Sequence, residues 1–148
     1  MFGYDALGRR VRKRFRHQVT RWVWDGDKPL HEWQELEVGP VAGSARDVLT
    51  WLFEADSFAP LAKLTAGGQA QCVVCDYLGT PLALYDSYGG VRQGRSKTPD
   101  CPFHYQGQYE DVETGLCYNR FRYYDPETGS CISQDPTSWW LCSLWIRP

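Results

Sequence analysis

A short unit recurs along this chain, in which an aspartate is followed three or four positions later by a glycine. An Asp side chain accepts hydrogen bonds from backbone amides just ahead of it, and glycine supplies the positive φ that many tight turns require. The unit therefore predicts repeated chain reversals. The residues expected to set them are Asp5, Gly8, Asp76, Gly79, Asp86, Gly89, Asp111, Gly115, Asp125 and Gly129.

Aromatic residues flank these turns, and the chain holds 7 Trp, 9 Tyr and 6 Phe among 148 residues. Such rings pair across the strands of a hairpin. A single hairpin cannot bury its own apolar face, so each must pack on its neighbours. The sequence thus predicts an all-β fold, an antiparallel meander of short hairpins. Its packed inner surface is expected to hold Tyr105, Tyr109, Tyr118, Phe121, Tyr123 and Tyr124.

Alternating and short apolar runs locate the strands of this meander. The predicted strands span 11–15, 19–24, 31–38, 48–54, 61–64, 70–77, 81–85, 103–105 and 118–124. Between them, the stretch 39–46 is predicted to be a turn-rich insertion, and the polar stretch 90–100 is predicted to be a loop.

The positive charges are concentrated between Arg9 and Arg21, although the net charge of the chain is only −2. A basic arm can bind nucleic acid or an anionic surface. Alternating Arg residues are also typical of the solvated face of a strand, and this second interpretation is favoured, with no nucleic-acid partner expected.

The sequence has no run of about 18 apolar residues, so no membrane span is predicted. It also has no apolar leader at its start, which favours synthesis in the cytoplasm. Export by a machine that needs no leader stays open.

Six stretches form one composite pattern: YDALGRRV at 4–11, WDGD at 24–27, DYLGTP at 76–81, FHYQGQY at 103–109, YNRFRYYDP at 118–126 and ISQDP at 132–136. Together they resemble the Rhs/YD-repeat family of bacterial proteins, specifically its repeat-associated core segment. A single copy of the unit would be a weak signal, whereas this long combination is specific. The resemblance covers residues 1–136.

The resemblance implies that residues 1–136 are a fragment of a YD-repeat β-shell, or cocoon. In this family the shell carries a variable toxin, and such polymorphic toxins are often delivered by type VI secretion. We therefore expect a structural segment that is not an enzyme, with no catalytic residue and no cofactor. The implied partners are the remaining YD-repeat shell, the toxin cargo and components of a secretion system.

The sequence departs from the family pattern in three places. It is far too short to enclose a cargo, because a cocoon needs many more repeats. A further repeat is missing near 90–101, which predicts an internal deletion there. Residues 137–148 form a divergent apolar tail in place of the Gly-Leu that follows the core in the family. We therefore expect a truncated or frame-shifted gene product, or an orphan core fragment that lacks the C-terminal toxin.

One alternative is a self-cleaving aspartyl autoprotease, because some family members cut their own chain at an Asp-Pro-x-Gly-Leu motif. The Asp-Pro pairs here begin at Asp125 and Asp135, and neither is followed by x-Gly-Leu. Both are interpreted as turn starters.

A second alternative is a zinc-binding or carbohydrate-binding β module. Cys72 and Cys75 have the spacing of zinc ligands, and Cys101 and His104 would supply a second pair. Residues three apart on a strand point to opposite faces, which weakens this site. Exposed rings could stack on sugars, but packing of the rings in the core is favoured.

Overall fold

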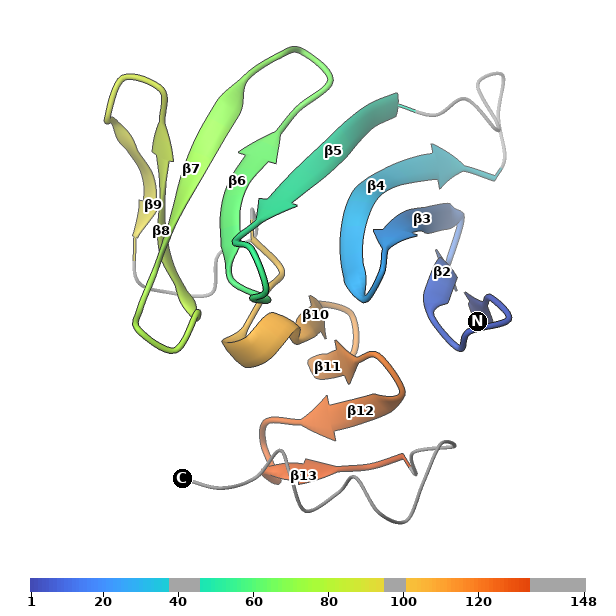
Figure 1. Ribbon diagram of the computed structural model, residues 1–148. Helices are drawn as coiled ribbons and strands as arrows, with labels where there is room; N and C mark the ends of the chain where they lie inside the picture. The colour runs from blue at the N-terminus through green and yellow to red at the C-terminus, as the bar shows by residue number, and fades with distance from the viewer. Residues whose placement is uncertain (38–45, 95–100, 134–148) are drawn as a thin grey trace.

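The computed structural model describes residues 1–37, 46–94 and 101–133, and most of these residues lie in β-strands. The larger of two sheets (Figure 1) consists of β1 (Phe2–Tyr4), β2 (Arg10–Phe15), β3 (Gln18–Asp25), β4 (Lys28–Leu36), β5 (Arg46–Phe53), β6 (Pro60–Leu64), β7 (Ala70–Cys75), β8 (Pro81–Asp86) and β9 (Val91–Gly94). A 3-10 turn, η1 (Tyr105–Gly107), precedes the smaller sheet. This sheet consists of β10 (Tyr109–Asp111), β11 (Leu116–Asn119), β12 (Arg122–Asp125) and β13 (Ser130–Cys131).

Both sheets are antiparallel meanders, because each strand pairs with the strand that precedes or follows it in the chain. The turn between β7 and β8 shows how the repeated unit works. Asp76 Oδ1 accepts hydrogen bonds from the backbone amides of Leu78 and Thr80, both at 2.9 Å. Gly79 adopts a φ of 82°, a conformation that favours glycine. The predicted all-β meander of short hairpins is confirmed.

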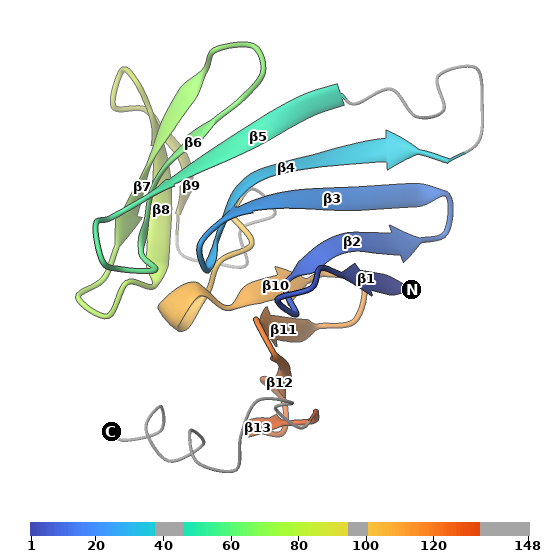
Figure 2. The same cartoon turned by 45° about the vertical axis from the view of Figure 1, so that its right-hand side comes forward.

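The larger sheet is strongly curved (Figures 1 and 2), and the segment that leads into β10 lies inside the curve. Irregular register interrupts the pairing of β3 with β4, of β5 with β6 and of β7 with β8. A bulge bends the strand that carries it and increases the local twist. The curvature places the two halves of the larger sheet on either side of the β10 segment (Figure 1).

Two of the predicted elements differ from the structure. The run 118–124 is not one strand: it is the end of β11, a turn, and the start of β12. Arg120 makes that turn possible with a φ of 49°, which the sequence does not reveal because the residue is not glycine. Phe103 makes only an isolated bridge, to Tyr109, and the chain then enters η1.

The predicted loop 90–100 contains β9 at its start, and residues 95–100 lie outside the described part of the chain. Of the predicted turn-rich insertion, 39–46, the last residue begins β5 and the others are outside the description. The sequence also gave no signal for the very short strands β1, β10 and β13. The tail 137–148 is likewise not described.

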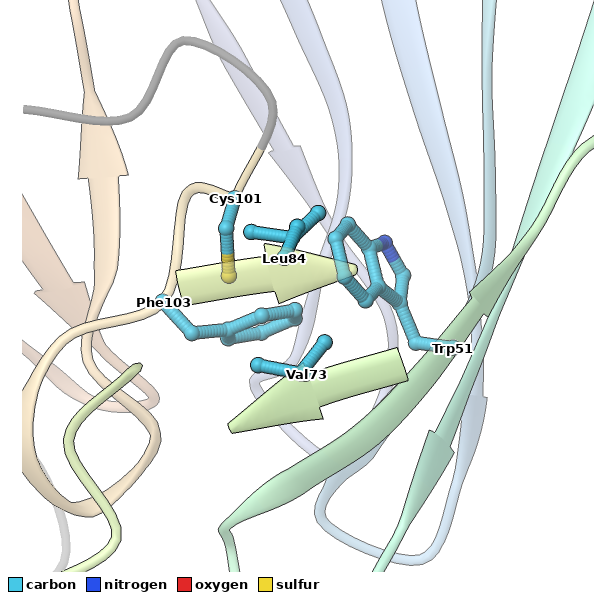
Figure 3. Close-up of a cluster of buried hydrophobic side chains, with 5 residues drawn as sticks. All are labelled: Trp51, Val73, Leu84, Cys101 and Phe103. Carbon is cyan, nitrogen blue, oxygen red and sulfur yellow. The ribbon is translucent and has the colours of Figure 1, made fainter. Parts of the chain in front are cut away.

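Five buried side chains form an apolar cluster where the larger sheet meets the segment that precedes β10 (Figure 3). Trp51, Val73 and Leu84 project from β5, β7 and β8 of the larger sheet, and Cys101 and Phe103 come from the segment before β10. Leu52 and Val74, which follow Trp51 and Val73 in the sequence, are exposed. Alternation along the strands thus gives the larger sheet an inner face covered by this segment and an outer face.

Candidate functional site: the junction between the two sheets

A buried ion pair joins the larger sheet to the smaller one. The Arg10 guanidinium of β2 donates a hydrogen bond through Nη1 to Asp111 Oδ2 of β10, and both side chains are 1% exposed. Lys13, also on β2, donates to the other carboxylate oxygen of Asp111 at 3.0 Å. A buried carboxylate is stable as an anion only when it is paired and hydrogen-bonded. Arg10 and Lys13 of β2 therefore both stabilise Asp111 as an anion.

Aromatic rings enclose the Arg10 guanidinium. Its central carbon lies 4.4 Å from the ring centroid of Tyr118 and 4.6 Å from that of Trp22. The ring centroids of Tyr109 and Phe2 each lie 5.4 Å from the same carbon. A cation over the face of an aromatic ring is attracted by the ring quadrupole, and desolvation strengthens the effect. These rings come from both sheets, so the cation holds the sheets together through them as well.

A second buried polar contact crosses the junction beside the ion pair. The Tyr109 hydroxyl donates to Glu32 Oε2 at 2.6 Å, and Trp22 Nε1 donates to the same oxygen at 3.1 Å. Burial, reinforced by the neighbouring Glu32 carboxylate, raises the pKa of Tyr109 well above its usual value. The phenol therefore stays protonated and remains a hydrogen-bond donor.

Tyr118 ties the smaller sheet to the backbone of β2. Its hydroxyl oxygen accepts a hydrogen bond from the Arg10 backbone amide at 2.9 Å, and the hydroxyl donates to the Gly8 carbonyl at 3.4 Å. Burial raises the pKa of Tyr118 to about 12. Trp24 Nε1 donates to the Arg10 carbonyl at 2.8 Å, and its ring meets that of Tyr118 edge-on.

The apolar cluster forms the other end of the junction. The Phe103 ring packs edge-on against Trp51 at 4.9 Å between centroids and against Phe53 at 5.3 Å. We name the four residues of the larger sheet that receive Phe103 the apolar socket: Trp51, Phe53, Val73 and Leu84. The contacts around Arg10 and those around Phe103 thus both hold residues 101–133 against the larger sheet.

The aspartates predicted to set turns fall into two groups. Asp5, Asp76 and Asp86 each accept, through one carboxylate oxygen, the backbone amides two and four residues ahead. Asp125 accepts the amide of Glu127 at 2.9 Å. In the turn after Asp111, by contrast, the backbone carbonyl of that residue accepts the amides of Thr114 and Gly115, and the side chain points to the junction. The predicted turn glycines Gly8, Gly79, Gly89, Gly115 and Gly129 all have positive φ.

The six rings predicted to form an inner surface are not equivalent. Tyr118 is buried, whereas Tyr105 is 39% exposed because the chain turns at η1 instead of continuing as a strand. The remaining four are half-buried: Tyr109, Phe121, Tyr123 and Tyr124.

The four predicted zinc ligands do not form one site. Cys72 is exposed, while Cys75 packs against the apolar cluster that contains Cys101. His104 instead lies 2.8 Å from the Glu110 carboxylate. Within the described residues, no group of three or more His, Cys, Asp or Glu side chains is arranged to hold a metal ion.

The carboxylate proposed for self-cleavage at Asp125 is occupied in its own turn. Its two oxygens accept the backbone amide of Glu127 and the Thr128 hydroxyl. The second Asp-Pro pair, at 135–136, lies outside the described residues.

The basic run in β2 and β3 is matched by carboxylates. On the outer side, Arg14 pairs with Glu37 at 2.7 Å, and Arg21 with Glu35 at 2.9 Å. The hydrogen bonds from Arg21 and Trp33 hold the pKa of Glu35 below its usual value. The charge of this run is therefore largely balanced within the chain.

In the described residues, no helix is both long and apolar enough to cross a membrane.

Sequence reasoning missed Arg10, Glu32 and Trp22 as members of the junction. Nothing local distinguishes Arg10 from its neighbours in the Arg-rich run, because its partner lies 101 residues away. The one signal available was a Glu and a Trp at positions where a strand is expected to face the core.

No family model matches the sequence. Toxin protein Tse5 of Pseudomonas aeruginosa is 36% identical over 182 residues, covering 91% of this chain and 13% of that protein. The probable deoxyribonuclease RhsB of Dickeya dadantii is 34% identical over 153 residues, covering 92% of this chain and 10% of that protein. The chain belongs to the Rhs/YD-repeat family.

A third relative, double-stranded DNA deaminase toxin A of Burkholderia cenocepacia, is 30% identical over 91% of this Rhs chain and 12% of its own length. The chain thus spans about a tenth of the length of these curated relatives.

Solved structures share the fold of this Rhs segment. The crystal structure of TcdB2-TccC3-TEV matches 91% of the chain with a TM-score of 0.62 and 18% identity, and 8% of that chain is covered. The Photorhabdus luminescens Tc holotoxin pore matches 92% with a TM-score of 0.63 and 16% identity, and 7% of that chain is covered. The fold is therefore that of Tc toxin β-shell proteins.

The prediction that the protein is not an enzyme is wrong. Relatives that match nine-tenths of the Rhs chain are named for enzymatic activities, one as a probable deoxyribonuclease and another as a DNA deaminase toxin. The prediction relied on turn and packing residues of a segment that makes up about a tenth of such proteins. Those residues do not report the chemistry of the whole protein.

Proposed function

We propose that this chain forms part of the wall of a β-shell in an Rhs-type toxin, and that the whole toxin carries an enzymatic activity directed at nucleic acid. The observation that carries the structural part is the junction. A buried ion pair and an apolar socket hold β10 and the segment that leads into it inside the curve of the larger sheet. The enzymatic part is supported by the names of the relatives.

The edges of the larger sheet support a place within a longer wall. Among the described residues, β1 and β9 each have one neighbouring strand and so present an unpaired edge. An unpaired edge is a template for a further strand, which binds through main-chain hydrogen bonds. We propose that neighbouring repeats of the shell pair with these two edges, and that the toxin cargo is the second partner.

A chimera tests this proposal. Residues 1–133 replace the matching segment of the Dickeya dadantii RhsB protein, and the product is tested for deoxyribonuclease activity and for protection of its toxin region from added protease. We expect the chimera to match unmodified RhsB both in activity and in the rate at which its toxin region is digested, because the transplanted wall keeps its own junction.

Two variants of the chimera serve as a matched pair. Asp111→Ala removes the buried carboxylate and should expose the toxin region to protease, whereas Glu127→Gln changes an exposed acid in a turn and should leave protection intact. If the toxin region of the unmodified chimera is digested as fast as that of the Asp111→Ala form, the proposed wall role is wrong.

A further inference from the structure

The two sheets are joined by side chains and not by strand pairing. In the part of the chain that the structure describes, the pairing runs without a break from β1 to β9 and starts again at β10. The contacts between the larger sheet and residues 101–133 include the apolar socket, the Arg10–Asp111 pair and the rings around that pair. An interface of this kind does not require the two parts to be covalently linked.

We infer that the inner face of the larger sheet is a docking surface that binds residues 101–133 as a separate unit. The surface fits a segment that presents an aromatic ring and, eight residues later, a carboxylate. The occupant is therefore this segment of the same chain, which should remain docked after the chain is cut. The inference goes beyond the proposed wall role and does not depend on it.

The aromatic anchor of the segment is Phe103, which is 3% exposed. Besides Trp51 and Phe53, its ring meets Tyr109 edge-on at 5.6 Å between centroids. Burial of a large ring in a well-packed pocket is typical of the residues that dominate binding energy.

The charged anchor is Asp111, which faces Arg10 and Lys13 on β2. Lys13 also binds Glu113 at 2.9 Å, so two cations of the larger sheet meet two carboxylates of the segment. Complementary charges fix the register of an interface. Removing one partner of a desolvated pair leaves the other buried without compensation, which strongly weakens the complex.

The segment holds its two anchors in place by its own hydrogen bonds. The His104 amide donates to the Gln108 carbonyl at 2.7 Å, and the Glu110 amide donates to the Pro102 carbonyl at 2.8 Å. These bonds close a compact turn between Phe103 and Asp111. A segment with its anchors already arranged loses less conformational entropy on docking.

Each side of the interface also contributes a glycine at a close approach between the two surfaces. A Cβ added to Gly107 of the segment would lie 3.0 Å from Phe58, and one added to Gly8 of the larger sheet would lie 2.9 Å from Phe121. Two reciprocal close contacts of this kind indicate a fitted shape.

The test uses the full chain with a protease recognition site inserted between Gly94 and Cys101. After cutting, the protein at about 1 µM is passed through a size-exclusion column, and each peak is identified by mass. We expect both fragments to elute together in native buffer and to separate in guanidinium chloride. Elution of the fragments as separate species in native buffer would overturn the inference.

Variants and exchange make the test specific. Asp111→Ala should raise the dissociation constant of the cut protein at least ~100-fold, whereas Glu127→Gln in the same segment should leave it unchanged. For the exchange, cut protein labelled with heavy isotopes is mixed with unlabelled cut protein in dilute urea and returned to buffer. Native mass spectrometry should then detect mixed pairs, in which one fragment is labelled and the other is not. Absence of mixed pairs would show that the released segment does not rebind as a separate unit and would overturn the inference.

Discussion

Arg10 and Asp111 form an ion pair in which each side chain is only 1% exposed, although 101 residues separate them in the sequence. The pair is not symmetrical. Asp111 pairs with two cations, Arg10 and, at 3.0 Å, Lys13, whereas among the described residues the ion pair of Arg10 is with Asp111 alone. Losing the acid and losing the arginine therefore have different consequences.

Asp111→Ala should lower the free energy of unfolding by about 3–5 kcal/mol, because the buried Arg10 guanidinium loses its counter-charge. Arg10→Met should cost less, since Lys13 still pairs with Asp111 and methionine can pack against the surrounding rings. The measurement is urea unfolding at pH 7.

The double variant Arg10→Met/Asp111→Leu provides the control for this pair, because it removes both buried charges at once. It should be more stable than Asp111→Ala alone. Equal stabilities of Asp111→Ala and Arg10→Met would show that Lys13 does not compensate Asp111.

The turn glycines allow backbone strain to be separated from steric overlap. Gly115→Val and Gly129→Val should each cost about 1–3 kcal/mol, because φ is 70° and 67° there and an added Cβ would meet nothing within 4 Å. Gly8→Ala should cost more than Gly115→Ala, since φ is similar but the new Cβ would overlap Phe121. Thermal melts of the four variants would rank them, and equal melting temperatures for the two alanine variants would contradict the contact with Phe121.

Much of the fold could be predicted from the sequence because its turns are local. Asp5, Asp76 and Asp86 bind amides within four residues of themselves, so the pattern alone carries the structure. The turn at Arg120 was missed because a non-glycine residue adopts the left-handed conformation, and the run around it alternates like a strand.

The junction could not be predicted for the opposite reason. Asp111 has the same local pattern as Asp125, yet its carboxylate turns away to Arg10, a residue at the other end of the chain. Local spacing contains no information on that choice. It depends on the curvature that brings β2 beside β10.

Alkaline pH should weaken the junction selectively. Burial raises the pKa of Tyr118 to about 12 and also raises the pKa of Tyr109 and Tyr123 above the usual value of 10. A pKa that is higher in the folded state stabilises the fold fully below the unfolded value, and the contribution is lost as pH rises through the folded value. The contribution of these tyrosines should thus be level below pH 10 and be lost between about pH 10 and 12. This loss adds to a decline that begins near pH 9, because burial also raises the pKa of the Cys75, Cys101 and Cys117 thiols. Urea unfolding at each pH follows both. In Tyr118→Phe the loss from the tyrosines should be shallower.

Thiol labelling reports whether the apolar socket stays closed. Burial raises the pKa of Cys75, Cys101 and Cys117 to about 11, while Cys72 and Cys131 are exposed. Only the thiolate reacts, so iodoacetamide at pH 8 should modify the two exposed cysteines at least ~10-fold faster than Cys101, as read by peptide mass spectrometry. In denaturant the rates should become equal. Asp111→Ala should accelerate labelling of Cys101 while leaving Cys72 unchanged, because loss of the charged anchor releases the segment that carries Phe103 from its socket. If iodoacetamide labelled Cys101 of the unmodified protein as fast as it labels Cys72, the apolar socket would be open.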